Sequence, residues 1–149
     1  MSTVHVKIGI EAPVERVWET IMDPDRLEDW VTIHRSVRDV SDQPLAKGST
    51  MEQVLHIRGV SFHVHWTLVD VSPPHRAEWT GFGPAHSRAR ILYQLYGDGA
   101  ERTEFEYTNE FTPPGGVLGS FASRMIVGTA SEREASSSLS RLKALLERS

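Results

Sequence analysis

The first thirty residues carry two different periods of apolar side chains, one after the other. Apolar residues occupy every second position from Val4 to Ile10, the period of two that is typical of a half-buried strand. After Pro13, apolar residues recur at helical spacing and form one stripe: Val14, Val17, Trp18 and Ile21. A second helix-start signal, Asp23-Pro24, predicts a short helix that carries Trp30. The chain is therefore expected to begin with a strand and two helices.

Six segments rich in β-branched and aromatic residues follow, separated by proline and glycine turn signals. The predicted strands are residues 33–41, 49–58, 61–71, 76–82, 86–96 and 101–111. After Gly116 comes a proline-free stretch whose apolar residues recur at helical spacing, which predicts one long C-terminal helix. These apolar residues are Leu118, Phe121, Met125, Leu139, Leu142 and Leu146. The predicted order is strand, two helices, six strands and a long helix.

Turn chemistry predicts how these strands pair. A two-residue turn at 59–60 with glycine first suits a type II′ hairpin, and a three-residue loop at 97–99 with Gly99 left-handed suits the last hairpin. The expected opposite pairs are Ile57–Phe62, Leu55–Val64, Gln53–Trp66 and Met51–Leu68 in the first hairpin, and Ile91–Phe105, Tyr93–Thr103 and Arg90–Glu106 in the last. Both registers gather the apolar side chains on one face of an antiparallel sheet.

Composition limits the classes of partner. A formal net charge of −4 with scattered Lys and Arg argues against nucleic acid, because phosphate binding draws on clustered basic residues. No apolar run is long enough to cross a bilayer, so no stable membrane insertion is expected. The absence of cysteine and of a secretion signal at the N-terminus makes a cytoplasmic location the expectation. Residues 1–149 are expected to form a single ligand-binding domain; the oligomeric state is left open.

Several segments together resemble the START-like (helix-grip, SRPBCC) superfamily, in its polyketide cyclase/dehydrase and lipid-transport branch. They are residues 12–18 (APVERVW), Asp23-Pro24 with Trp30, residues 70–76 (DVSPPHR) and the glycine turn at 97–99. The resemblance covers the whole chain. It implies an α+β fold: a curved seven-stranded antiparallel sheet around a long C-terminal helix, enclosing a cavity. The glycine-rich loop of the plant allergen branch is missing, since residues 41–49 contain only Gly48.

The polar residues on the apolar face of the sheet are the first candidates for ligand contact. A core meant only for packing does not favour such side chains, because each needs a hydrogen-bond partner when it is buried. They are Gln53, Tyr93, Thr103, Tyr107 and Asn109. We expect Gln53, Tyr93, Tyr107 and Asn109 to contact a ligand; the alternative is that these groups bond to one another. Trp66, Trp79, Phe105, Phe121 and Met125 fit either cavity wall or core.

The middle of the C-terminal helix is small or polar, which would leave room for a ligand. If the stripe from Leu118 continues, Thr129, Glu132 and Ser136 face the sheet, and Thr129 contacts the ligand. Glu132 would then suit proton transfer, unless the helix is rotated so that this carboxylate reaches solvent. His34, soon after Trp30, would line the mouth of the cavity or lie on the surface.

Three hypotheses about function remain open at this stage. The first is binding, or transport, of a hydrophobic small molecule such as a lipid or a polyketide-like aromatic. The second is a cyclase or dehydratase, in which Tyr93 or Tyr107 polarises a carbonyl and Glu132 or His34 moves the proton. The third is a protein-interaction module like the chaperone co-activators. No cofactor is expected. No metal site is expected either, because the histidine group His56, His63 and His65 falls on the sheet's outer face.

Overall fold

The computed structural model describes residues 2–57, 59–112 and 117–148, with the side chains of residue 2 and of residues 117–131 left out. Its strands are β1 (Ser2–Ile10), β2 (His34–Arg38), β3 (Thr50–Ile57), β4 (Val60–Ser72), β5 (Arg76–Phe82), β6 (Arg88–Gly97) and β7 (Thr103–Thr112). Its helices are α1 (Val14–Ile21), α2 (Leu27–Trp30) and α3 (Val117–Glu147), with 3-10 turns η1 (Pro24–Arg26) and η2 (Pro84–His86). The predicted order of elements is confirmed.

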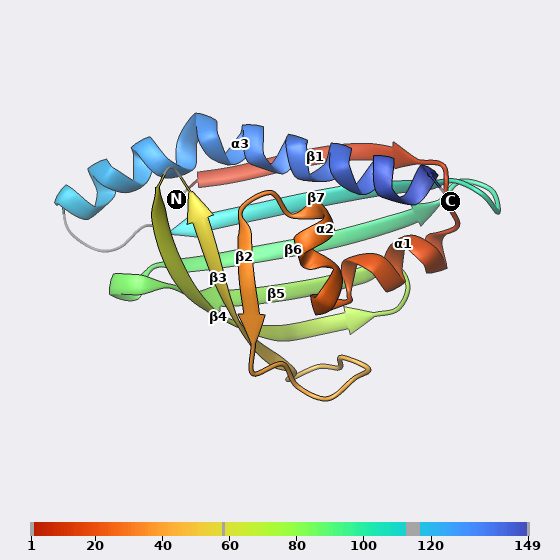
Figure 1. Cartoon of the computed structure of the whole chain (residues 1–149), viewed down its shortest axis with the longest axis horizontal. Helices are drawn as coiled ribbons and strands as arrows, with labels where there is room; N and C mark the ends of the chain where they lie inside the picture. The colour runs from red at the N-terminus through yellow and green to blue at the C-terminus, as the bar shows by residue number, and fades with distance from the viewer. Residues whose placement is uncertain (1, 58, 113–116, 149) are drawn as a thin grey trace.

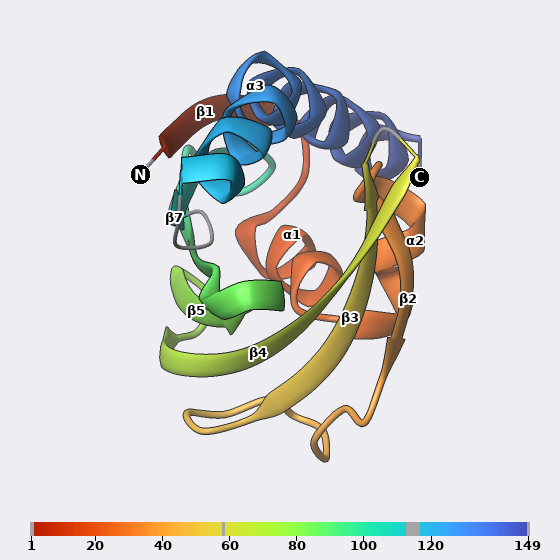
Figure 2. The ribbon, with the colours of Figure 1, turned by 90° about the vertical axis from the view of Figure 1, so that its left-hand side faces the viewer.

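The strands form one antiparallel sheet in the order β1-β7-β6-β5-β4-β3-β2. The sheet curls strongly, and α3 runs across its open side, packed against β1 and α2 (Figures 1 and 2). Helices α1 and α2 close one end of the space between sheet and helix (Figure 2). This is the curved sheet around a long C-terminal helix that the resemblance implied.

The first hairpin, β3–β4, has a register that differs from the predicted one by two residues. Leu55 pairs with Phe62, and Val64 pairs with Gln53, because the ladder ends at the pair Ile57–Val60. Gly59 precedes Val60 and has a φ of +81°, a conformation that glycine adopts at little cost. A slip of two residues keeps each side chain on its face, so Met51, Gln53 and Leu55 still point inward.

The last hairpin differs from the prediction by four residues. Its loop spans residues 98–102 and is closed by a hydrogen bond from the Asp98 N–H to the Arg102 carbonyl (2.8 Å). Ile91 therefore pairs with Asn109 and Tyr93 with Tyr107, and Arg90 lies opposite Glu110. The slip is again even, so the prediction that Ile91 and Phe105 share the inner face is confirmed.

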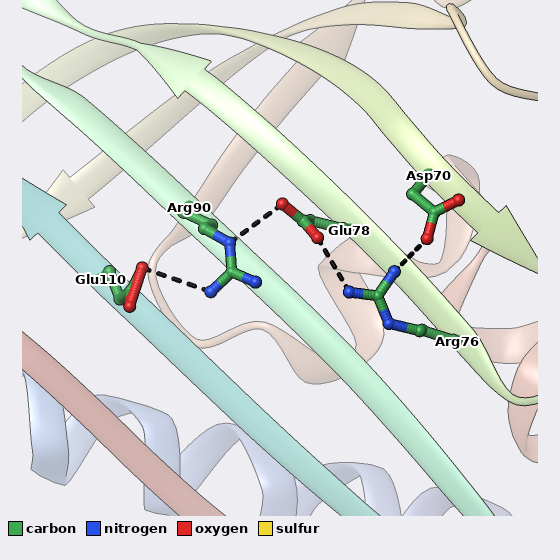
Figure 3. A network of polar contacts seen from close by, with 5 residues as sticks. All are labelled: Asp70, Arg76, Glu78, Arg90 and Glu110. Carbon is green, nitrogen blue, oxygen red and sulfur yellow. Dashed lines mark hydrogen bonds and ion pairs between the residues drawn. The ribbon is translucent and has the colours of Figure 1, made fainter.

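The outer face of the sheet carries a chain of ion pairs across four strands (Figure 3). Glu78 on β5 lies at its centre and accepts hydrogen bonds from Arg90 and Arg76, both at 2.9 Å. Arg90 also donates to Glu110 at 3.2 Å, and Arg76 donates to Asp70. The hydrogen bond from Arg90 holds the pKa of the Glu78 carboxyl below its usual value, against the opposing effect of burial.

Replacing Glu78 with glutamine should lower the free energy of unfolding at pH 7 by on the order of 1 kcal/mol, because two guanidinium groups lose their shared partner. The pKa of Glu78 is depressed in the folded state. Its contribution is therefore present above the unfolded pKa of about 4.3 and is lost as pH falls through the folded pKa. Denaturant titrations at several pH values measure the difference. Glu110→Gln, which removes a single arginine contact, is the control; an equal or larger loss there would contradict the central role of Glu78.

Candidate functional site

A cavity of about 200 Å³ lies between the concave face of the sheet and helices α2 and α3. Its walls are mostly apolar and aromatic, and three of the four tryptophans contribute to them: Trp30, Trp66 and Trp79. The polar residues in the walls are Gln53 on β3, Arg88 and Tyr93 on β6, Tyr107 and Asn109 on β7, Glu134 and Ser138 on α3, and Ser87 between η2 and β6. The apolar remainder includes Val31, Ile33, Met51, Leu55, Phe62, Val64, Ile91 and Leu139.

The floor of the cavity depends on a glycine that leaves space for an indole ring. Gly81 on β5 pairs with Trp66 on β4, and a Cβ at Gly81 would lie 2.7 Å from the Trp66 ring. No real Cβ contact is that short, so glycine lets the Trp66 ring lie across the neighbouring strand. Trp66 is only 3% exposed in this position.

A chain of hydrogen bonds fixes the polar atoms at this end of the cavity. The Trp66 Nε1–H donates to Gln53 Oε1 at 2.8 Å, and Gln53 Nε2 lies 2.8 Å from His34 Nδ1. An indole N–H can only donate, so the Gln53 carbonyl must face Trp66 and its amide N–H must face His34. His34 Nδ1 therefore accepts, and the neutral ring carries its proton on Nε2. Gln53 lines the cavity, whereas His34, a candidate for its mouth, does not and instead contacts Gln53 from behind the wall.

Burial lowers the pKa of His34 below its usual value, and the nearby Glu28 carboxylate opposes this shift only partly. The folded protein therefore favours the neutral ring that Gln53 requires. As pH falls below about 6.5, the unfolded chain binds a proton before the folded one does, so the folded state loses stability. The unfolding free energy of the wild type relative to His34→Gln should fall between pH 7.5 and 5.5. A difference that is flat or rises on acidification would contradict the hydrogen-bond chain.

Two tyrosines and an asparagine form a second polar group in the cavity. Tyr93 and Tyr107 lie opposite each other on β6 and β7, with ring centroids 6.1 Å apart. Burial raises the pKa of the Tyr93 hydroxyl above its ordinary value and that of Tyr107 to about 12, although a hydrogen bond from Asn109 partly offsets the latter. Asn109 Nδ2 donates to the Tyr107 hydroxyl oxygen at 3.2 Å. Both phenols are therefore neutral hydrogen-bond donors at physiological pH.

Helix α3 presents a different face to the cavity than the sequence predicted. Ala135, Ser138 and Leu139 are buried and line the cavity, whereas Glu132 and Ser136 are exposed. Of the two orientations left open for Glu132, the structure has the rotated helix, in which this carboxylate is exposed. The residues between the two apolar ends of α3 are small or polar, so they do not indicate which face of the helix packs against the sheet. Phe121, Met125 and Thr129 are also candidates, and their side chains lie outside the described part.

Glu134, rather than Glu132, is the α3 carboxylate that lines the cavity. It lines the cavity and accepts a 2.5 Å hydrogen bond from the Thr32 hydroxyl, while the Thr32 N–H donates to Ser138 Oγ at 3.0 Å. These bonds tie α3 to the segment after α2. Counting helical turns back from Leu142 gives Ser138 and then Glu134, so a stripe extended from the C-terminal end could have indicated this face.

The remaining candidates separate into core and outer surface. Phe105 is fully buried but does not line the cavity; it packs edge-on against Tyr93 with centroids 5.6 Å apart. His63 and His65 are exposed on the outer face, where His65 contacts Glu52 at 2.5 Å.

Across the described ranges, no three His, Cys, Asp or Glu side chains are grouped so that they could hold a metal ion. No helix in these ranges is both long and apolar enough to cross a membrane.

Comparison with known proteins places the chain in a family. The sequence model of the family described as "Polyketide cyclase / dehydrase and lipid transport" matches residues 1–147. The chain belongs to this family. The resemblance carried by residues 12–18 and 70–76 is therefore confirmed.

Solved structures with the family's fold cover almost the whole chain. The Zhui aromatase/cyclase from Streptomyces sp. R1128 superposes with a TM-score of 0.79 at 16% identity, covering 99% of this chain and 94% of that one. A conserved protein from Geobacillus kaustophilus superposes with a TM-score of 0.76 at 19% identity, covering 99% and 96%. At these identities the likeness establishes the fold.

A curated relative matches part of the chain. A Mycobacterium tuberculosis protein that is named a toxin is 26% identical over 95 residues, which make up 64% of this chain and 66% of that protein. The match thus spans slightly less than two thirds of the relative's length.

Proposed function

We propose that this protein binds a hydrophobic small molecule in the cavity between the sheet and α3. The observation that carries the proposal is the composition of the walls: three tryptophans and many aliphatic side chains surround a few oriented polar groups. Small-molecule sites have this composition, in which apolar walls supply the affinity and a few polar groups orient the ligand. Family membership supports the proposal.

The volume of the cavity indicates the size of a suitable probe. An apolar cavity of about 150 Å³ can hold benzene, so the 200 Å³ here suits a molecule of one or two rings. The neutral two-ring ketone 1-tetralone is therefore the probe of choice. It has no charge to bury, and its ring can lie against Trp79 and Ile91.

Binding of 1-tetralone should quench or shift the tryptophan emission and raise the melting temperature. At a free concentration 100 times the dissociation constant the stabilisation is about 2.7 kcal/mol, which corresponds to roughly 5–10 °C for a chain of this size. Fluorescence titration and calorimetry measure the two effects. If tetralin, 1-tetralone and hydroxylated tetralones all leave both signals unchanged up to their solubility limits, the proposal falls.

A second candidate, acid–base catalysis on a bound carbonyl compound, is favoured by one observation. A carboxylate, Glu134, and two neutral phenols, Tyr93 and Tyr107, line the same cavity. The carboxylate would remove a proton from the carbon next to a carbonyl, and a phenol would donate a hydrogen bond to the enolate oxygen. Cyclisation and dehydration of a polyketide-like chain both need such an enolate.

Hydrogen–deuterium exchange at C2 of 1-tetralone in D₂O tests this chemistry without a known substrate. The base takes one C2 proton, and the enolate recovers a deuteron from solvent through the same carboxyl group. The wild type should accelerate exchange, and Glu134→Gln should reduce the acceleration at least tenfold while 1-tetralone still binds. Glu132→Gln, an exposed position on the same helix, is the matched control. Equal exchange in both variants would exclude Glu134 as the base.

A further inference from the structure

Two polar atoms in the cavity walls are buried without a hydrogen-bond partner among the residues that the structure describes. They are the indole Nε1 of Trp30 and the amide Oδ1 of Asn109. Trp30 is 1% exposed, and both residues line the cavity. An unsatisfied buried group costs about 1–3 kcal/mol, and native proteins tolerate few of them. Two such atoms on one cavity indicate that the cavity is built for a partner that brings its own polar groups.

The two atoms have opposite hydrogen-bonding character. The Trp30 N–H can only donate. Asn109 uses its Nδ2 to donate to Tyr107, which leaves Oδ1 as a free acceptor. Trp30 lies on α2 and Asn109 on β7, so the atoms come from different elements around the cavity. A matching ligand therefore needs one acceptor and one donor at separate positions.

The charges around the cavity select against an anionic ligand. Arg88 and Glu134 are the charged side chains among the described residues of the lining. Arg88 is exposed, and its guanidinium lies over the Phe82 ring, 5.6 Å from the centroid, where both side chains face solvent. Glu134 is half-buried on α3 and repels a carboxylate. Apart from Arg88, the described residues of the lining include no cation that could offset a negative charge buried in the cavity.

We propose that the ligand is a neutral ring compound with a carbonyl group bound by the Trp30 N–H and a hydroxyl group donating to Asn109 Oδ1. This inference rests on the proposed binding function and specifies its ligand class. The apolar part of the ring system lies against Trp79 and Ile91. A hydroxylated cyclic ketone satisfies both buried atoms at once, whereas a hydrocarbon chain, such as a lipid tail, satisfies neither.

Four two-ring probes of similar size test the assignment in the wild type. Tetralin has neither group, 1-tetralone has the carbonyl, 5,6,7,8-tetrahydro-2-naphthol has the hydroxyl, and 6-hydroxy-1-tetralone has both. Each satisfied atom should strengthen binding several-fold, so 6-hydroxy-1-tetralone should bind at least tenfold more tightly than tetralin. The anion of 5,6,7,8-tetrahydro-2-naphthoic acid should bind more weakly than tetralin.

Two variants assign the groups. Trp30→Phe removes the N–H but keeps a ring, so the advantage of 1-tetralone over tetralin should disappear while the advantage of the naphthol remains. Asn109→Leu should do the reverse. Trp79→Phe is the control, because Nε1 of Trp79 is not among the unsatisfied atoms; it should weaken all four probes alike. Melting temperatures verify that each variant is folded, and the wild-type probe series decides the matter if one is not.

The outcomes separate the two proposals. If no probe binds, the binding function itself fails. If tetralin binds as tightly as 6-hydroxy-1-tetralone, or if Trp30→Phe weakens all probes equally, the binding function stands and the assignment of Trp30 and Asn109 is overturned. Selective loss of the carbonyl advantage in Trp30→Phe supports it.

Discussion

Replacing Gly81 with valine is expected to lower the free energy of unfolding by roughly 3 kcal/mol and to disorder one wall of the cavity. A Cβ at this position would meet the Trp66 ring at 2.7 Å and a Val64 methyl group at 2.8 Å. Trp66 must then move, and its hydrogen bond to Gln53 is lost. Denaturant unfolding measures the stability, and the near-ultraviolet circular dichroism of tryptophan reports the displacement.

The matched control for Gly81 is a glycine in the neighbouring strand. Gly97 ends β6, and a Cβ there would come no closer than 4.0 Å to another residue. Gly97→Val adds the same side chain to the same sheet and should cost less than about 1 kcal/mol. If the two variants are equally stable, the close approach of Trp66 to β5 does not determine the shape of the cavity.

Replacing Ala135 with phenylalanine should weaken the binding of 1-tetralone at least tenfold and leave the folded protein about as stable as before. Ala135 is a buried α3 residue in the cavity wall, so a benzyl side chain there occupies the space that the ligand needs. Filling a void with an apolar group adds contacts rather than removing them, which limits any loss of stability. Calorimetric titration and thermal unfolding of the same sample measure both quantities.

Ala144→Phe is the control for this substitution. Ala144 lies on the same helix but is exposed, so the change in composition and in helix propensity is the same without any effect on the cavity. A strong loss of stability in Ala135→Phe without ligand would mean that the space is already packed. In that case the binding and catalytic hypotheses both fall, and a protein-interaction role becomes the better account.

The order of elements and the inner face of the sheet could be predicted because they depend on local patterns. The period of two in each strand survives an even slip in register. Both hairpins show this: Leu55 and Ile91 kept their face although neither has its predicted partner. The registers themselves could not be predicted, because Gly59 and Gly99 both take the positive φ expected of them, and the register depends instead on where each ladder ends around its loop. The loop at 98–102 is also closed by its own backbone hydrogen bond.

The sequence predicted the cavity residues of the sheet, but not the residues that helices α2 and α3 contribute to the cavity walls. Four cavity residues could be predicted because a polar side chain on an apolar face needs a hydrogen-bond partner: Gln53, Tyr93, Tyr107 and Asn109. The rotation of α3 places Glu134 rather than Glu132 at the cavity; this face follows the stripe of the C-terminal leucines, which packs against β1 and α2, and not the stripe that begins at Leu118. The unsatisfied N–H of Trp30 depends on what surrounds it in three dimensions and leaves no signal in sequence.

The indole N–H signals of the four tryptophans test the central claim, that the ligand binds between the sheet and α3, most directly. Trp30, Trp66 and Trp79 line the cavity, whereas Trp18 on α1 does not and serves as an internal reference. In ¹H–¹⁵N spectra recorded during a titration with 6-hydroxy-1-tetralone, the signals of the three cavity tryptophans should shift together and saturate at one dissociation constant. The Trp18 signal should stay in place. Saturable shifts confined to Trp18, or no saturable shift in any of the four, would contradict the account.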